Sequence, residues 1–149
     1  MAASVIVSNL RVDDDRPEDI SDDLNRALQV VDGAFGLNID GREVVFDDRP
    51  LFSLYLLKGG IVGALFAPSR PFRLCSFYSS DEVSFSTGIA GVMLGRIRVL
   101  GLEQEFEMSY ADLCQSVGDS FRTVHRLLED VAPVSLQTWP MYHIFDGII

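Results

Sequence analysis

Two cysteines and two histidines carry the side chains of this chain that are most suited to nucleophilic, acid–base or metal chemistry. Cys114 and His125 fall within one predicted helix, where a thiol and an imidazole could form a nucleophile–base pair. Eleven residues at ~1.5 Å each place them about 16 Å apart along a straight helix. That distance excludes proton transfer between them, and His125, on the flank of an apolar stripe, is predicted to be a partly buried structural residue.

The other reactive residues make no recognisable site. Cys75 lies in the apolar run RLCSF of a predicted strand and is most simply a small core residue. His143 and Asp146 point the same way in a helical turn, but two ligands in an apolar tail do not define a metal site. The two cysteines are far apart and lack CxxC spacing, which indicates a reduced, cytosolic protein.

Motifs of catalysis and of phosphate binding are absent from the sequence. The serines have no GxSxG context, and the glycines of GIAGVMLGRIRVLGL match neither GxGxxG nor GK[ST]. Glu103, Glu105 and Glu107 alternate, which indicates one exposed strand face rather than a pair of catalytic carboxylates. The sequence therefore predicts a protein that is not an enzyme and takes no metal and no cofactor.

The clearest element that could position any of these residues is a helix predicted from Ser109 to Val131. Ser109 and Asp112 resemble a capping box, and Pro133 prevents the helix from continuing. A narrow apolar stripe recurs along it at steps of three and four, formed by Leu113, Val117, Phe121, Val124, Leu128 and Val131. Such a stripe needs a hydrophobic surface to cover, and the chain before it predicts a sheet.

The N-terminal part predicts a strand followed by a helix. Residues 4–12, SVIVSNLRV, favour a strand with Ile6, Leu10 and Val12 on one face, within an N-terminal strand or arm of residues 1–16. Pro17 and the acids around it suit the first turn of a helix. Its apolar stripe, Ile20, Leu24, Ala27, Leu28 and Val31, stops at Gly33, a predicted C-cap.

From residue 34 to residue 102 the apolar pattern changes to a period of two. Asp40-Gly41 predicts a two-residue hairpin turn between FGLNI and REVVF. LFSLYLL, IVGALFA, FRLCSFY and EVSFST follow as strands closed by turn residues, with Lys58-Gly59-Gly60 as one of the turns. Gly88 to Leu102 is either a bent strand or a helical turn leading into RIRVL, with Arg96 and Arg98 exposed. The predicted fold is α+β, an antiparallel meander packed by an N-terminal and a long C-terminal helix.

Length and charge define the class of protein. A chain of 149 residues, 48% of them apolar, is most simply one domain, residues 1–149. A net charge of −10 argues against binding nucleic acid. No uncharged apolar run reaches the ~18 residues that span a bilayer, and there is no signal-peptide pattern, so a cytoplasmic protein is expected.

The acids are concentrated at the two ends of the chain. Residues 1–50 hold 12 acids and 5 bases, residues 51–98 hold 2 and 5, and residues 99–149 hold 8 and 2. Solvated helix faces explain this distribution, and the alternative is a surface for a basic partner. The apolar C-terminal tail, residues 133–149, must dock either on its own subunit or on another one.

This layout resembles the class I type III secretion chaperones of bacteria, the Tir-chaperone (CesT-like) family. The matching pieces are the helix of residues 20–31 running into FGLNIDGREVVF, and GVMLGRIRVLGLE leading into the long helix. The resemblance implies a homodimer that binds an extended segment of an effector protein along apolar grooves and sheet edges. The groove residues it implies come from the predicted strands: Phe52, Leu54, Leu65, Phe72 and Leu74.

Two features depart from that family's pattern. Its members usually begin with the first helix, whereas a strand is predicted here before it. They also carry a middle helix, often used in dimerisation, where residues 68–81 predict a strand. Two other functions are compatible with the sequence: an immunity or antitoxin-type protein that neutralises a basic toxin, and a small regulatory domain that binds an apolar ligand.

Overall fold

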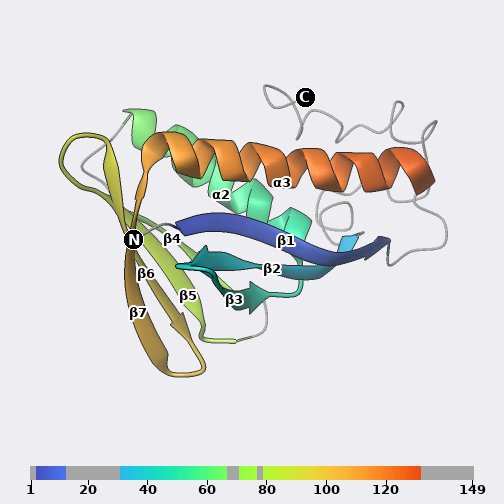
Figure 1. The fold of residues 1–149 in the computed structure, drawn as a ribbon, viewed down its shortest axis with the longest axis horizontal. Coiled ribbons are helices and arrows are strands. Elements are labelled where there is room, and N and C mark those ends of the chain that lie inside the picture. The colour runs from blue at the N-terminus through green and yellow to red at the C-terminus, as the bar shows by residue number, and fades with distance from the viewer. Residues whose placement is uncertain (1–2, 13–30, 67–70, 77–78, 132–149) are drawn as a thin grey trace.

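Seven antiparallel strands and two helices make up the part of the chain that the structure describes (Figure 1). The structure is a computed structural model and describes residues 3–12, 31–66, 71–76 and 79–131. The predicted N-terminal helix and the tail of residues 133–149 lie outside these residues. In chain order the elements are β1 (Ala3–Val12), β2 (Val31–Ile39), β3 (Arg42–Asp47), α2 (Pro50–Phe66), β4 (Phe72–Cys75), β5 (Glu82–Thr87), β6 (Val92–Val99), β7 (Leu102–Ser109) and α3 (Tyr110–Val131).

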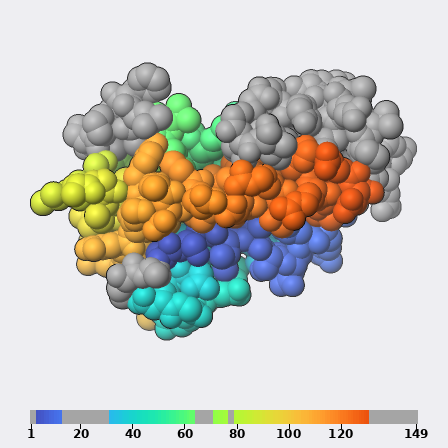
Figure 2. Space-filling view, turned by 45° about the horizontal axis from the view of Figure 1, so that its top comes forward, coloured from blue at the N-terminus to red at the C-terminus, as the bar shows by residue number. Residues whose placement is uncertain are grey.

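The strands form two sheets, and the predicted α+β class is confirmed. One sheet has the order β1-β2-β3 and the other the order β4-β5-β6-β7. α2 contacts both β2 and β4, so it joins the two sheets, and α3 packs chiefly on β1. Figure 2 shows α3 as a ridge across the molecule, with β1 directly beneath it. The β6–β7 hairpin points away from both helices (Figure 1).

The predicted hairpin at Asp40-Gly41 is confirmed. Both residues have positive φ, 53° for Asp40 and 83° for Gly41, as the two central residues of a type I′ turn require. The Asn38 side chain accepts a hydrogen bond of 2.9 Å from the Gly41 amide. Local turn chemistry thus sets the register of β2 against β3 from the turn as far as Gly36 and Val45, beyond which the register shifts.

The face predicted for the first strand is wrong at Ile6. In the first half of the strand the odd-numbered residues face the core, with Val5 buried and Val7 packed on it. In the second half the even-numbered residues Leu10 and Val12 pack on the core instead. The strand switches which side chains face the core at Asn9, where φ is 52° and the register against β2 shifts between Ser8 and Arg11.

The predicted helix end at Gly33 is also wrong. β2 begins at Val31 and pairs with β1 there, so Gly33 lies inside a strand. Its φ of 152° is positive and favours glycine, but it is far from the roughly +57° of the left-handed helical residue that ends a helix. A glycine that follows an apolar stripe is therefore not sufficient to locate the end of a helix.

The largest correction concerns LFSLYLL and IVGALFA, which form one helix, α2, instead of two strands. Pro50 occupies its first position, and the Arg49 carbonyl accepts a 3.0 Å hydrogen bond from the Ser53 amide. The predicted turn fails because Gly60 has a packing role: a Cβ there would lie 2.4 Å from the Phe72 ring. The glycine lets α2 approach β4 closely.

The second sheet is the predicted meander with shorter strands. β4 ends at Cys75, which is exposed, so the prediction of a buried core cysteine is wrong. Gly88 to Leu102 divides into a turn that ends at Gly91, the strand β6, and a two-residue turn at Leu100-Gly101. Strand is thus the correct alternative for this segment, and no helical turn is present in it.

The helix α3 agrees closely with its prediction. The Asp112 amide donates a 2.9 Å hydrogen bond to the Ser109 hydroxyl, which caps the helix. On the inner side of the same helix, Ser116 accepts a 3.1 Å bond from the Val5 amide and thereby covers the edge of β1. The buried stripe consists of Leu113, Val117, Phe121, Val124 and Leu128.

An ion pair between the first two strands predicts a dependence of stability on pH. Arg11 and Asp32 lie directly opposite each other on β1 and β2, and the Arg11 Nε donates to the Asp32 carboxylate at 2.9 Å. This hydrogen bond lowers the pKa of Asp32; burial opposes it, and the Gly33 amide lowers the pKa further. Since the folded pKa lies below that of the unfolded chain, about 3.9, the pair stabilises the fold above that pH. The stabilisation disappears as the pH falls through the folded pKa.

We expect Asp32→Asn to melt at a lower temperature than the wild type at pH 7 and to lose less stability on acidification. Thermal melts between pH 6 and pH 2 measure this, with Asp130→Asn, at an exposed helical position, as the control. Parallel acid limbs for the wild type and Asp32→Asn would contradict the assignment.

Candidate protein-binding surface

The five residues predicted to line a binding groove do not form one surface. Phe52, Leu54 and Leu65 lie on α2 instead of on strands, and the side chain of Leu65 is outside the described part of the structure. Leu54 and Leu74 are core residues, 0% and 2% exposed. Phe52 is half-buried against the core, and Phe72 stacks on Phe85 at 5.2 Å between ring centroids. The side chains of Phe52, Leu54, Phe72 and Leu74 thus contribute to packing.

The reactive residues remain dispersed in the structure. Cys75 lies on β4, whereas Cys114 and His125 are both on α3, and His125 is 6% exposed. His125 Nδ1 lies 3.7 Å from the Glu129 carboxylate, one helical turn away. Among the described residues, no three side chains of His, Cys, Asp or Glu gather as ligands for a metal ion.

A groove of about 530 Å³ separates α2 from α3. Its walls are mostly apolar, with Ile61 and Val62 on one helix and Val117 on the other. The basic side chains of Lys58 and Arg122 belong to its lining. Tyr110, the first residue of α3, has a raised pKa. Burial is the main cause, and the hydrogen bond with the Cys114 thiol is the next.

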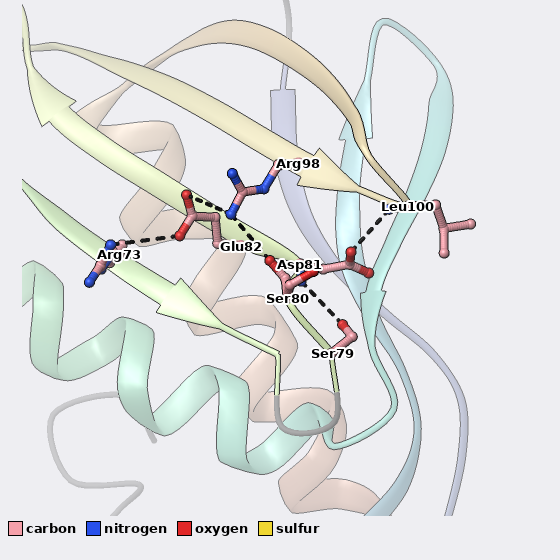
Figure 3. A network of polar contacts seen from close by, with 7 residues as sticks. All are labelled: Arg73, Ser79, Ser80, Asp81, Glu82, Arg98 and Leu100. Carbon is pink, nitrogen blue, oxygen red and sulfur yellow. Dashed lines mark hydrogen bonds and ion pairs between the residues drawn. The ribbon is translucent and has the colours of Figure 1, made fainter.

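The outer face of the four-stranded sheet carries rows of charges across the strands (Figure 3). Glu82 on β5 lies between Arg73 and Arg98, at 3.8 and 3.3 Å. One row farther along, Arg96 on β6 pairs with Glu105 on β7 at 3.0 Å. A shallow hollow of about 620 Å³ lies over this face. The inner face is mostly apolar and contributes Phe85, Ile97 and Phe106 to the core.

β7 forms an edge of this sheet, because it pairs with β6 alone among the described strands. Its side chains alternate: Phe106 and Met108 are buried, whereas Glu103, Glu105 and Glu107 are exposed. The predicted single exposed face of the three glutamates is confirmed. The sequence alone does not indicate that this strand is an edge, because edge position depends on which strands pair.

The β6–β7 turn is held in place and presents two leucines. Leu100 has a φ of 54°, and its amide donates a 3.0 Å hydrogen bond to the Asp81 carboxylate (Figure 3). Its side chain points away from the polar network and is 86% exposed, and Leu102 is 78% exposed. Leucine rarely adopts positive φ, so the turn displays an apolar side chain at some cost in backbone energy.

Comparisons with known proteins give no relative from which a function could be transferred. No protein-family model matches the chain, and neither the curated proteins nor the solved structures contain a match. None of the helices in the described ranges has both the length and the apolar character needed to cross a membrane. The function must therefore be inferred from the surfaces above.

Proposed function

We propose that this chain is a non-enzymatic protein-binding module that holds an extended segment of a partner protein, in the manner of a small acidic secretion chaperone acting in the cytoplasm. The observation that carries the proposal is β7, an eight-residue edge strand with an exposed charged face. An exposed edge offers backbone donors and acceptors to an added strand, which is a general mode of peptide recognition.

The position of α2 supports this proposal. The secretion chaperones usually carry a middle helix before their last strands, and α2 precedes β4 to β7 in the same way. α2 also exposes apolar side chains, with Leu56 40% and Val62 45% exposed and Gly59 open between them. A homodimer formed through this helix would cover that surface.

Two other functions each have one observation in their favour. The three exposed glutamates of β7 suit a basic toxin, as expected for an immunity protein. The α2–α3 groove of about 530 Å³ has the size of a small-ligand site, as expected for a regulatory domain.

Size-exclusion chromatography with light scattering and co-purification from the native host test the proposal. A dimer that co-purifies stoichiometrically with a secreted protein supports it. A strict monomer contradicts the chaperone. Co-purification with a basic toxin also contradicts it and favours the immunity protein. A small molecule retained in native mass spectrometry favours the regulatory domain.

We expect Cys75→Ala and His125→Ala to leave partner binding unchanged, because β4, which carries Cys75, is the opposite edge of the sheet from β7 and His125 is buried on α3. Binding is measured by co-purification of equal amounts of each folded variant, with circular dichroism as the check on folding. Loss of function in a folded variant of either kind would reopen the hypothesis of an enzyme.

A further inference from the structure

The β7 edge has a charge pattern that defines which segment it can take. Resting on the proposed function, we infer that β7 binds an extended segment of another protein with Lys or Arg at positions i and i+4, paired with Glu103 and Glu107.

The turn at Leu100-Gly101 determines which backbone groups of β7 face outward. In a two-residue hairpin the flanking residues, Val99 and Leu102, form a hydrogen-bonded pair. Hydrogen-bonded and non-hydrogen-bonded pairs then alternate along an antiparallel ladder. The register continues without a shift to Ser109, so the amides and carbonyls of Glu103, Glu105 and Glu107 point away from β6.

The same residues place their side chains on the outer face, where two of them lack a partner. Arg96 pairs with Glu105, and Arg98, which is opposite Glu103 in the register, pairs instead with Glu82. Glu107 is opposite Leu94, which is apolar. Within the described ranges, neither Glu103 nor Glu107 forms an ion pair, so the charge rows end on two unmatched carboxylates at the edge.

The spacing of Glu103 and Glu107 selects an extended partner. Four residues of a strand span about 14 Å, and positions i and i+4 of an added strand lie on the same face at the same spacing. Along a helix, the same two positions are only about 6 Å apart. An added strand can run parallel or antiparallel to β7, because two basic residues four positions apart have the same spacing in either direction.

The two ends of β7 differ in what they contact. Toward the turn, Arg42 of β3 donates a 2.7 Å hydrogen bond to the Gln104 side chain, which lies on the face of β7 opposite to the glutamates. β1 contacts β7, and Figure 1 shows this contact near the end of β7 that leads into α3. At the other end, Leu102 is 78% exposed beside Glu103 and offers an apolar contact to the added strand. An edge with backbone groups, two carboxylates and one leucine is suited to a basic, extended polypeptide.

Synthetic nine-residue peptides test the inference directly. The first carries lysines at i and i+4 in a background of Thr, Val and Ser, and the second carries the same residues with lysines at i and i+3. In a strand, the second peptide places its lysines on opposite faces. Titration by fluorescence anisotropy at low salt should show the first peptide binding at least about fivefold more tightly, with an affinity that falls as salt screens the two pairs.

Variants locate the site. The double variant Glu103→Gln, Glu107→Gln should remove the preference for the first peptide, whereas Glu43→Gln, at an exposed position on the edge strand β3, should leave it unchanged. Amide hydrogen exchange should slow at Glu103, Glu105 and Glu107 on binding, because these amides become hydrogen-bonded to the added strand.

Equal affinity for the two peptides, no binding of either, or an unchanged preference in the double glutamine variant would overturn the inference. Its failure is distinguishable from failure of the proposed function. If the double variant still co-purifies with the native partner of the wild type, the protein-binding function stands and only its assignment to β7 falls. If the wild type has no protein partner, the proposed function fails.

Discussion

Phe121→Asp is expected to abolish stable folding or to lower the melting temperature by about 10 °C or more. Phe121 is fully buried at the centre of the α3 stripe, and Lys58 Nζ lies 5.9 Å from the centroid of its ring. Loss of a buried phenylalanine costs about 3–5 kcal/mol, and burial of a carboxylate adds to that cost. For a domain of this size, each kcal/mol corresponds to about 2–4 °C. Thermal circular dichroism measures the change.

The control for this variant is Ala111→Asp, which adds the same charge to the exposed side of α3. Its position in the first helical turn is favourable for an acid, because the helix N-terminus carries partial positive charge. We expect it to melt within a few degrees of the wild type. If Phe121→Asp also melted like the wild type, the face of α3 that packs on the sheet would be misassigned.

The amphipathic helix α3 could be predicted from sequence because its pattern and its environment agree. One side of it packs on β1 while the other side faces solvent, so Leu113, Val117 and Phe121 recur with the helical period. Ser109 adds a local cap that is independent of tertiary structure. Where the local pattern and the tertiary packing require the same structure, as in α3, the sequence alone is sufficient to predict the helix.

α2 could not be predicted because its surroundings are apolar on several sides. It contacts β2, β4 and α3, and the side it exposes carries Leu56 and Val62, so its sequence has no polar face from which a helical period could be recognised. Its glycines resemble turn residues, but Gly60 is required by the approach of the Phe72 ring. A short apolar run of this kind is compatible with a buried strand or a buried helix, and only tertiary packing distinguishes them.

The candidate surface was predictable only in part for a similar reason. The alternation of Glu103, Glu105 and Glu107 is sufficient to predict an exposed face. Which of these acids lacks a partner depends on Arg96 and Arg98, and thus on the register and pairing of β5, β6 and β7. Leu54 and Leu74 were predicted to line a groove and are core residues, because an apolar residue of a groove and one of the core have the same sequence pattern.

Gly95→Ala is expected to lower the free energy of unfolding by about 2–3 kcal/mol. Gly95 lies between Phe85 and Phe106 in the register of the second sheet, and a Cβ at this position would lie 2.1 Å from Phe106 Cζ. The Phe106 ring cannot move away easily, because it is 2% exposed and packs edge-on against Phe85 at 5.9 Å. Overpacking of a core costs typically about 1–3 kcal/mol. Urea unfolding measures the loss, and Gly59→Ala, at an open helical position, should instead stabilise by up to about 1 kcal/mol.

A double-mutant cycle with Phe106→Leu separates this clash from any intrinsic preference for glycine in the strand. The shorter leucine removes the ring atoms that the new methyl group would meet, and that methyl group then fills part of the space left by the ring. We therefore expect the double variant to be more stable than the sum of the two single changes predicts, by at least about 1 kcal/mol. Strict additivity would mean that the ring does not cross Gly95 in solution, and the packing of the aromatic row over this sheet would have to be revised.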